Sequence, residues 1–567
     1  MEHSSLQTLT SVPPSLSIAV LCGVALSLWL AIRSKAGGLP YPPGPKGLPF
    51  IGNVLEVDLK EPHITYTRWA AQYGTWEVIY SRLLNQDFVI ISSEKVARHL
   101  ADQRSTIYSD RPQSPLYKLF GVDRMTFLLT YCSEWKAHRK LLHLSLKPEA
   151  VDQYQDMYLS SARRLLGNLK QNGTNFREHF HLYTGAISLE LTYGRRIEGK
   201  NDPIISLATS LGVILSEETT PEKSGLLMAF PLLRYLPAWF PGLGFMHYAG
   251  PSRKMVHTLA ELPYNTAKQQ MESGVLPQCL VHDFLTHGEV EEASAKDAAA
   301  GVYLGLSSSI EKGYALTQWL RQPAAAESAA AILETLVLAM ILYPDVQQKV
   351  HAELDAVLGK GNLPTFADRP RLPYLQAVLF ELLRWQPVFP LGVPHATTTN
   401  DIYEGYYIPK GCIVIFNVWA MTRNCPDPEH FDPTRHLTSD GQVIPQARQH
   451  YGIHFGFGRR VCPGRTFAEY ALWAAAATML SSLKFEKAKD ARGNYIDIKL
   501  EFTHGQARLV RFLWWPDSDL QLIVIDRTVT HYLSSAPLRT GWMIDHQTSH
   551  CIRGLFLINQ SADAGHE

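Results

Sequence analysis

One cysteine stands in a context that favours thiolate chemistry. Cys462 lies in the run Phe455-Gly-Phe-Gly-Arg-Arg-Val-Cys-Pro-Gly464, directly before a helical stretch that starts at Arg465. The N–H groups and the dipole of a helix N-terminus favour a cysteine anion. The glycines let backbone approach a flat partner closely, and Arg460 can pair with an anionic group of that partner. The spacing therefore predicts a thiolate that binds a flat, anionic group.

The remaining chemistry-bearing residues exclude several other classes of protein. The chain has 53 Lys+Arg and 53 Asp+Glu, and this balance argues against a nucleic-acid binder. Seven scattered cysteines in 567 residues do not make a disulfide scaffold. A zinc site has little support, because the sequence contains neither C-x-x-C nor H-E-x-x-H.

A second candidate site is the pair Glu381 and Arg384. Three residues apart, the two side chains share one face of a helix. A surface ion pair is the simple alternative, but the apolar residues around the pair predict a buried helix. A buried ion pair needs further hydrogen-bonding partners.

These residues resemble the cytochrome P-450 superfamily of haem-thiolate monooxygenases, whose F-x-x-G-x-R-x-C-x-G motif is filled at every fixed position. The resemblance implies heme b as the cofactor, with Cys462 as the axial ligand of its iron. A thiolate ligand favours O–O cleavage. It also implies that Arg460 pairs with a haem propionate, and that Phe455 and Gly464 belong to the cofactor site.

Three further motifs fit the same resemblance. Trp135 and Arg139 match W-x-x-x-R, whose side chains contact a propionate, although a plain amphipathic helix would give the same pattern. His395 resembles another propionate contact, or is a loop histidine with ordinary partners. Arg435 matches the arginine of P-x-R-F, which completes a three-way network with E-x-x-R; His436 replaces the phenylalanine, so the local packing is open.

The expected oxygen-activation helix departs from the pattern. The run from Ala324 to Ser328 fits [AG]-G-x-[DE]-[TS] loosely, and implies that Glu327 relays protons while Ser328 hydrogen-bonds the bound oxygen. Ala325 replaces the usual glycine and serine replaces threonine, so an alanine-rich helix with one acid is the alternative. We interpret 306–323, which contains Gly313 and ends in Pro323, as a retained intron or a gene-model error.

Both ends of the chain are distinctive. Residues 15–32 carry no charge and span about 27 Å as a helix, which predicts a transmembrane anchor after a lumenal segment 1–14. Basic residues after 32 place the rest in the cytosol; a cleaved signal peptide is the alternative. Residues 33–53 form a proline-rich hinge, or alternatively an SH3 ligand. Residues 511–567 form an atypical tail, either a misread frame or an appendage, and no hairpin is recognisable after 505.

The elements that must position these residues are mostly helices. Strand patterns occur at 87–91 and 411–416. The prediction is a mainly α catalytic domain over 54–510 with small β-sheets, the cytochrome P-450 fold, preceded by one transmembrane helix. Helical periodicity covers 131–170, 179–193, 252–272, 324–342, 345–358, 371–385 and 463–483.

The function expected from the resemblance is insertion of one oxygen atom of O2 into a lipophilic substrate. No NAD or flavin fingerprint occurs in the chain, so NADPH-cytochrome P-450 reductase at the endoplasmic reticulum membrane is the expected electron donor. Residues 230–242 resemble microsomal fungal enzymes related to O-methylsterigmatocystin oxidoreductases, which implies secondary metabolism. A haem-binding pseudoenzyme, or a reductase-independent haem-thiolate isomerase or dehydratase, is the alternative.

Overall fold

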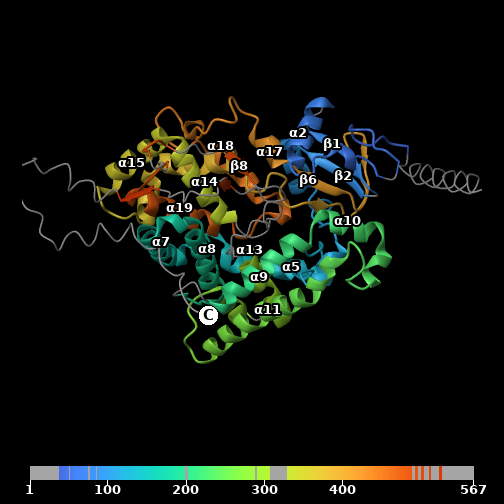
Figure 1. The fold of residues 1–567 in the computed structure, drawn as a ribbon, viewed down its shortest axis with the longest axis horizontal. Coiled ribbons are helices and arrows are strands. Elements are labelled where there is room, and N and C mark those ends of the chain that lie inside the picture. The colour runs from blue at the N-terminus through green and yellow to red at the C-terminus, as the bar shows by residue number, and fades with distance from the viewer. Residues whose placement is uncertain are drawn as a thin grey trace, which may run out of the picture.

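The computed structural model describes residues 38–49, 51–73, 77–84, 86–197, 202–287, 290–306, 328–487, 492–495, 500–502, 510–512 and 523–526. Helices dominate this part of the chain, and the sheet that contains β1 (Val78–Leu83), β2 (Gln86–Ile91) and β6 (Ile413–Phe416) lies toward one end of it (Figure 1). The helices are α2 (Pro62–Gln72), α3 (Glu94–Arg98), α4 (Pro115–Phe120), α5 (Ser133–Leu146), α6 (Pro148–Val151), α7 (Gln155–Gln171), α8 (Phe176–Tyr193), α9 (Pro203–Glu218), α10 (Pro221–Ala229), α11 (Ala249–Glu272), α12 (Leu280–His287), α13 (Glu292–Leu306), α14 (Ser328–Leu342), α15 (Pro344–Leu358), α16 (Pro373–Trp385), α17 (Val418–Thr422), α18 (Pro445–Gly452) and α19 (Arg465–Ser482).

The largest sheet joins strands from residues 78–91 to strands from residues 395–416. Its strand order is β1-β2-β6-β3, from β1 (Val78–Leu83), β2 (Gln86–Ile91), β6 (Ile413–Phe416) and β3 (His395–Ala396). β2 pairs with β6 in parallel, while the other two contacts are antiparallel. Three two-stranded sheets pair β4 (Asp401–Tyr403) with β5 (Tyr406–Ile408), β7 (Leu483–Glu486) with β10 (Ile523–Asp526), and β8 (Leu500–Phe502) with β9 (Val510–Phe512).

The predicted class, mainly α with small sheets, is confirmed. Helical periodicity was expected over 131–170, and the structure divides this range into α5, α6 and α7. Pro148 begins α6, and Lys147 before it is extended with ψ at 152°. Proline cannot donate the helical hydrogen bond and disfavours a helical conformation in the preceding residue, so the chain turns there.

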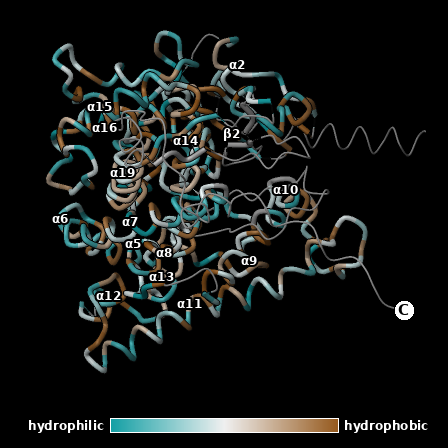
Figure 2. The backbone as a smooth tube through the Cα atoms, turned by 60° about the vertical axis from the view of Figure 1, so that its left-hand side comes forward, coloured by the Kyte–Doolittle hydropathy of each residue, from teal (hydrophilic) through white to brown (hydrophobic). Residues whose placement is uncertain are grey.

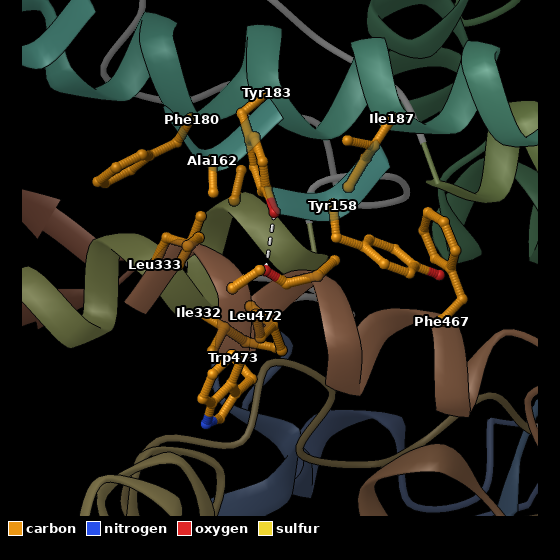
Figure 3. Packing of buried hydrophobic residues seen from close by; sticks show 14 of the residues in the cluster. Tyr158, Ala162, Phe180, Tyr183, Ile187, Ile332, Leu333, Phe467, Leu472 and Trp473 are labelled. Carbon is orange, nitrogen blue, oxygen red and sulfur yellow. Dashed lines mark hydrogen bonds between the residues drawn. The ribbon is translucent and has the colours of Figure 1, made fainter. Parts of the chain in front are cut away.

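The core lies around α14 and α19, which run inside a shell of other helices (Figure 2). Both helices are rich in Ala and Leu, which favour helix, and their side chains are buried over most of their length. Tyr183 from α8 reaches across to α19 and donates a hydrogen bond to the Ala471 carbonyl at 2.8 Å, among packed aromatic rings (Figure 3). This packing fixes the helix that follows Cys462.

Several predictions concern segments outside the described residues. The expected anchor at 15–32 and most of the suspected insertion at 306–323 lie there. Within the described residues, no single helix is long and apolar enough to cross a bilayer; α14 and α15 together reach that length but are bent by 105°. The sequence showed no final hairpin, whereas the structure pairs β8 with β9 and β10 with β7, so residues 511–512 and 523–526 of the tail belong to sheets.

Candidate active site

The thiolate loop, residues 455–464, connects two short turns to the buried helix α19. The loop follows η10 (Ile453–Phe455), contains η11 (Gly458–Arg460) and ends at Gly464, the N-cap of α19. The Cys462 N–H donates to the Phe455 carbonyl at 2.7 Å and closes the loop. The cysteine is thereby held two residues before a helix N-terminus, as the sequence predicted, where N–H groups favour an anion.

The Cys462 side chain is accessible although protein surrounds it on most sides. The residue is exposed to solvent. The protein around its sulfur nevertheless removes enough water to raise the pKa of the thiol above the ordinary value. The Gly464 N–H, and then the guanidinium groups of Arg139 and Arg465, act in the opposite direction on this pKa. An accessible sulfur facing donors and cations is suited to holding a positively charged partner as the thiolate.

Gly458 shows a second reason why the loop needs glycine. Its φ is +58°, and a Cβ at this position would lie 2.0 Å from the Ala101 carbonyl oxygen in η2 (His99–Gln103). The Gly458 N–H donates to Asp102 Oδ1 at 2.8 Å. Besides any flat cofactor, the close partner of this glycine is therefore the chain's own backbone.

Arg460 lies buried against an aromatic ring beside the loop. Its Nε donates to the Ser109 carbonyl and its Nη2 to the Leu129 carbonyl, both at 2.7 Å. Its guanidinium carbon lies 4.3 Å from the centre of the Trp135 ring in α5, a cation–π distance. Burial lowers the pKa of Arg460 to about 10. The structure thus brings Arg460 and Trp135 together, as the motifs predicted.

Arg139 and His395 complete the predicted set around the loop. Arg139 donates from Nη1 to the Val461 carbonyl at 2.8 Å, which ties α5 to the residue before Cys462. His395, in β3, has Nδ1 2.7 Å from the Tyr108 carbonyl. Because a carbonyl only accepts, Nδ1 carries the proton. Burial, and then the charge of Arg111, lowers the pKa of His395 well below its usual value, so the ring is neutral. To donate a hydrogen bond from Nε2 to a carboxylate, the ring would need a second proton, and that carboxylate would stabilise the imidazolium.

Arg111 is a residue that the sequence reading missed. It donates from Nε to the Phe127 carbonyl at 3.1 Å and from Nη1 to the carbonyls of Val393 and Pro394 at 2.7 and 2.6 Å. Burial, and then the charge of Arg460, lowers the pKa of Arg111 to about 9. No local pattern marks this arginine, because two of its three carbonyl partners lie on a loop more than 280 positions away.

The cationic cluster of Arg111, Arg139 and Arg460 fits an anionic cofactor. Among the described residues, none of these three side chains is paired with a carboxylate within 4.0 Å. Arg460 Nη1 and Ser109 Oγ are buried, with no hydrogen-bond partner in the same part of the chain. Buried cations and orphaned donors are costly unless a partner satisfies them. The carboxylates of haem would do so, with its iron at Cys462, so the residues fit heme b.

The structure brings Glu381, Arg384 and Arg435 together behind the loop. Arg384 donates to both carboxylate oxygens of Glu381, from Nε at 2.7 Å and from Nη2 at 2.8 Å. The Arg435 Nε lies 3.5 Å from Glu381 Oε1. The Glu381 side chain is completely buried, as the apolar helix predicted. His436, where phenylalanine was expected, also reaches Glu381.

The predicted oxygen-activation pair is only partly described. Glu327 lies outside the described residues, and Ser328 is the half-buried first residue of α14. On α13, a Cβ at Gly301 would lie 3.4 Å from the Thr126 amide nitrogen and hydroxyl. That hydroxyl is 3.0 Å from Nδ1 of His138, whose pKa burial lowers to about 4. His138 is thus a buried histidine that stays neutral at neutral pH.

A helical fold with an accessible cysteine at a buried helix, a cationic cradle and a buried Glu–Arg network defines a haem-thiolate protein. The family Cytochrome P-450 matches residues 42–246 and 324–507. A cytochrome P-450 monooxygenase from Armillaria gallica is 36% identical over 87% of this chain and 94% of its own length. One from Coprinopsis cinerea is 34% identical over 85% and 89%, and one from Postia placenta is 35% identical over 86% and 90%.

This chain belongs to the cytochrome P-450 family. It is a haem-thiolate monooxygenase, an oxidoreductase that incorporates oxygen and carries heme b. Its reaction uses O2 and a lipophilic substrate, and family members usually take electrons from a redox partner. The match stops at 246 and resumes at 324, directly after the suspected insertion.

Proposed function

We propose that this chain inserts one oxygen atom of O2 into a lipophilic metabolite at a haem held by Cys462, as a step in fungal secondary metabolism. The observation that carries this proposal is the accessible Cys462 at the start of α19, next to arginines with no acidic partner among the described residues. When bound, the haem supplies the iron centre that activates O2, with the thiolate favouring O–O cleavage.

The residues divide this work among binding, orientation and proton delivery. Cys462 holds the iron, and Trp135, Arg139, Arg460 and His395 orient the haem carboxylates. Phe455 and Gly464 shape the loop on either side of the sulfur. The missed Arg111 joins this cradle, because it has no carboxylate partner among the described residues and its charge acts on that of Arg460.

Proton delivery is assigned to the start of α14. Glu327 relays protons from solvent, and the Ser328 hydroxyl donates a hydrogen bond beside it. The position of Ser328 at the start of a buried helix supports this assignment. Glu381, Arg384 and Arg435 hold the thiolate loop from behind and take no part in proton transfer.

Electrons are supplied by NADPH through cytochrome P-450 reductase. Exposed cations around the thiolate loop and on α5 support a docking surface for an acidic partner. They are Lys136, Lys140, Arg448 and Arg459.

A single-pass anchor at 15–32 holds the catalytic domain on the cytosolic face of the endoplasmic reticulum. Exposed apolar side chains on the segment after α10 support contact with a membrane: Leu232 is 79% exposed and Trp239 is 76% exposed. This segment lies at the same end of the molecule as β1 and β2 (Figures 1 and 2), and Gly225 in α10 packs beside Leu84 after β1. Aromatic and aliphatic side chains of this kind settle at bilayer interfaces.

The test uses the full chain purified with its haem. We expect the reduced protein to give the carbon monoxide spectrum of thiolate-ligated haem, and Cys462→Ser to abolish it. Cys132→Ser is the matched control, because Cys132 is half-buried at the start of α5. A retained thiolate spectrum in Cys462→Ser would show that another group binds the iron.

Turnover separates the proposed reaction from the alternatives. With reductase and a metabolite extract, NADPH consumption and incorporation of label from 18O2 into a product support the monooxygenase. A thiolate spectrum with product formation that needs neither reductase nor O2 would point to isomerase or dehydratase chemistry. A thiolate spectrum with no product from any extract would favour the pseudoenzyme.

A further inference from the structure

The Glu381 carboxylate accepts hydrogen bonds from Arg384, from a distant backbone N–H and from His436. Oε1 accepts from Arg384 Nη2 at 2.8 Å and from the Asp432 N–H at 2.9 Å. Oε2 accepts from Arg384 Nε at 2.7 Å and lies 2.9 Å from His436 Nε2. Burial acts to raise the pKa of Glu381, but the hydrogen bonds from His436 and Arg384 leave it below its ordinary value. An ionised carboxylate only accepts, so His436 Nε2 is the donor.

Arg435, the expected third member of this network, stands further away. Its Nε is 3.5 Å from Glu381 Oε1 and makes no hydrogen bond within the described part of the chain. Its guanidinium instead donates to the backbone carbonyls of Pro426 and Asp427. The direct hydrogen bond expected from the second arginine is therefore made here by the next residue, His436.

Aromatic contacts lead from His436 to the thiolate loop. The His436 ring meets Phe380 edge-on at 6.1 Å, and Phe380 packs on Tyr451 at 4.7 Å between ring centres. Tyr451 lies 5.2 Å from Phe455, whose carbonyl accepts the hydrogen bond from the Cys462 N–H. His436 is thus linked to the thiolate loop by a continuous series of ring contacts through Phe380 and Tyr451.

We propose that His436 is a positioning residue that anchors Glu381 and, through it and the aromatic contacts, keeps the thiolate loop in place. A phenylalanine at 436 could pack against Phe380 but could not donate to Glu381. The substitution found in this chain thus exchanges a packing residue for a hydrogen-bonding one. The carbon monoxide spectrum used in the test rests on the proposed role of Cys462 as the iron ligand, whereas the circular dichroism measurement does not.

The test compares three variants of the full-length holoprotein with wild type: His436→Phe, His436→Gln and the control His247→Phe. His247 is exposed and makes no side-chain hydrogen bond among the described residues. Two quantities are followed in urea, namely the thiolate-type carbon monoxide spectrum and the far-ultraviolet circular dichroism. A hydrogen bond to a charged group contributes measurably to stability. At a given urea concentration, His436→Phe should therefore lower the ratio of thiolate-ligated to unligated protein by about tenfold or more.

Glutamine places an amide N–H close to the position of Nε2, so His436→Gln should recover most of the loss, while the control should match wild type. If His436→Phe yields no holoprotein but His436→Gln does, the proposal also stands. It is overturned if His436→Phe behaves like wild type, or if His436→Gln is no better than His436→Phe. Failure of wild type itself to give a thiolate spectrum would instead refute the ligand role of Cys462, and the circular dichroism comparison would still decide the inference on His436.

Discussion

Replacing Gly458 with alanine perturbs the docking of the thiolate loop at one defined atom. The new Cβ would lie 2.0 Å from the Ala101 carbonyl oxygen and 2.7 Å from its carbon, far inside van der Waals contact. Either the loop or η2 must move, and the hydrogen bond from Gly458 to Asp102 is stretched or lost. Gly456 offers a control without the collision: its φ is also positive, at +85°, but its Cβ would meet only the Arg460 carbonyl oxygen at an ordinary 3.8 Å.

The two substitutions both place alanine at a positive φ but differ in the collision. Gly456, with ψ at −173°, lies in a region that is essentially restricted to glycine, which costs about 1–3 kcal/mol for alanine. The left-handed strain at Gly458 costs about 1–2 kcal/mol. Overpacking against rigid backbone adds about 1–3 kcal/mol for Gly458→Ala alone. We therefore expect Gly458→Ala to lose more unfolding free energy than Gly456→Ala, and to release its haem more readily.

Urea unfolding followed by circular dichroism gives the first quantity, and the rate of haem transfer to an acceptor protein gives the second. The reasoning is refuted if the two alanine variants have the same unfolding free energy and the same transfer rate. In that case the short approach to Ala101 would place no constraint on the loop.

Three further predictions concern charge. Glu381→Gln should cost about 3–5 kcal/mol in urea unfolding, because it leaves Arg384 uncompensated in the interior; an unchanged midpoint would contradict the network. Arg111→Met should speed haem transfer by about tenfold, the effect of one charge-assisted contact, and an unchanged rate would remove Arg111 from the cradle. The hydrogen bond between His450 and Glu94 raises the pKa of His450 and lowers that of Glu94, so it stabilises the fold at mildly acidic pH and is lost as pH rises through the raised pKa or falls through the lowered one. His450→Gln should remove the loss of stability as pH rises through the raised pKa of His450, measured by thermal unfolding with wild type as the reference. The acid-side dependence should persist, because Arg98 also pairs with Glu94 and lowers its pKa.

The sequence was most informative where function depends on spacing along one element. Glu381 and Arg384 share a helix turn, and Cys462 precedes the helix that fixes it, so local pattern was sufficient to find both. The long helices were found from periodicity for the same reason. Periodicity over 131–170 did not show where the chain turns; the break falls at Pro148, which begins a new helix.

Residues whose partners are distant in the chain could not be found in this way. Arg111 is defined by carbonyls on a loop far along the chain, and His436 by a carboxylate 55 positions before it. Gly458 was recognised as a close-approach glycine, but the backbone that it approaches lies more than three hundred positions earlier. The roles of Glu327 and of the anchor at 15–32 stay predictions.

The parallel pairing of β2 with β6 cannot form until most of the chain has been synthesised. The two strands meet across 325 positions of the chain, so β2 leaves the ribosome long before its partner exists. At ordinary elongation rates the wait is roughly 16–65 s. During that interval the hairpin of β1 and β2 presents an open edge, and premature partners must be kept from it until Ile413 to Phe416 emerge.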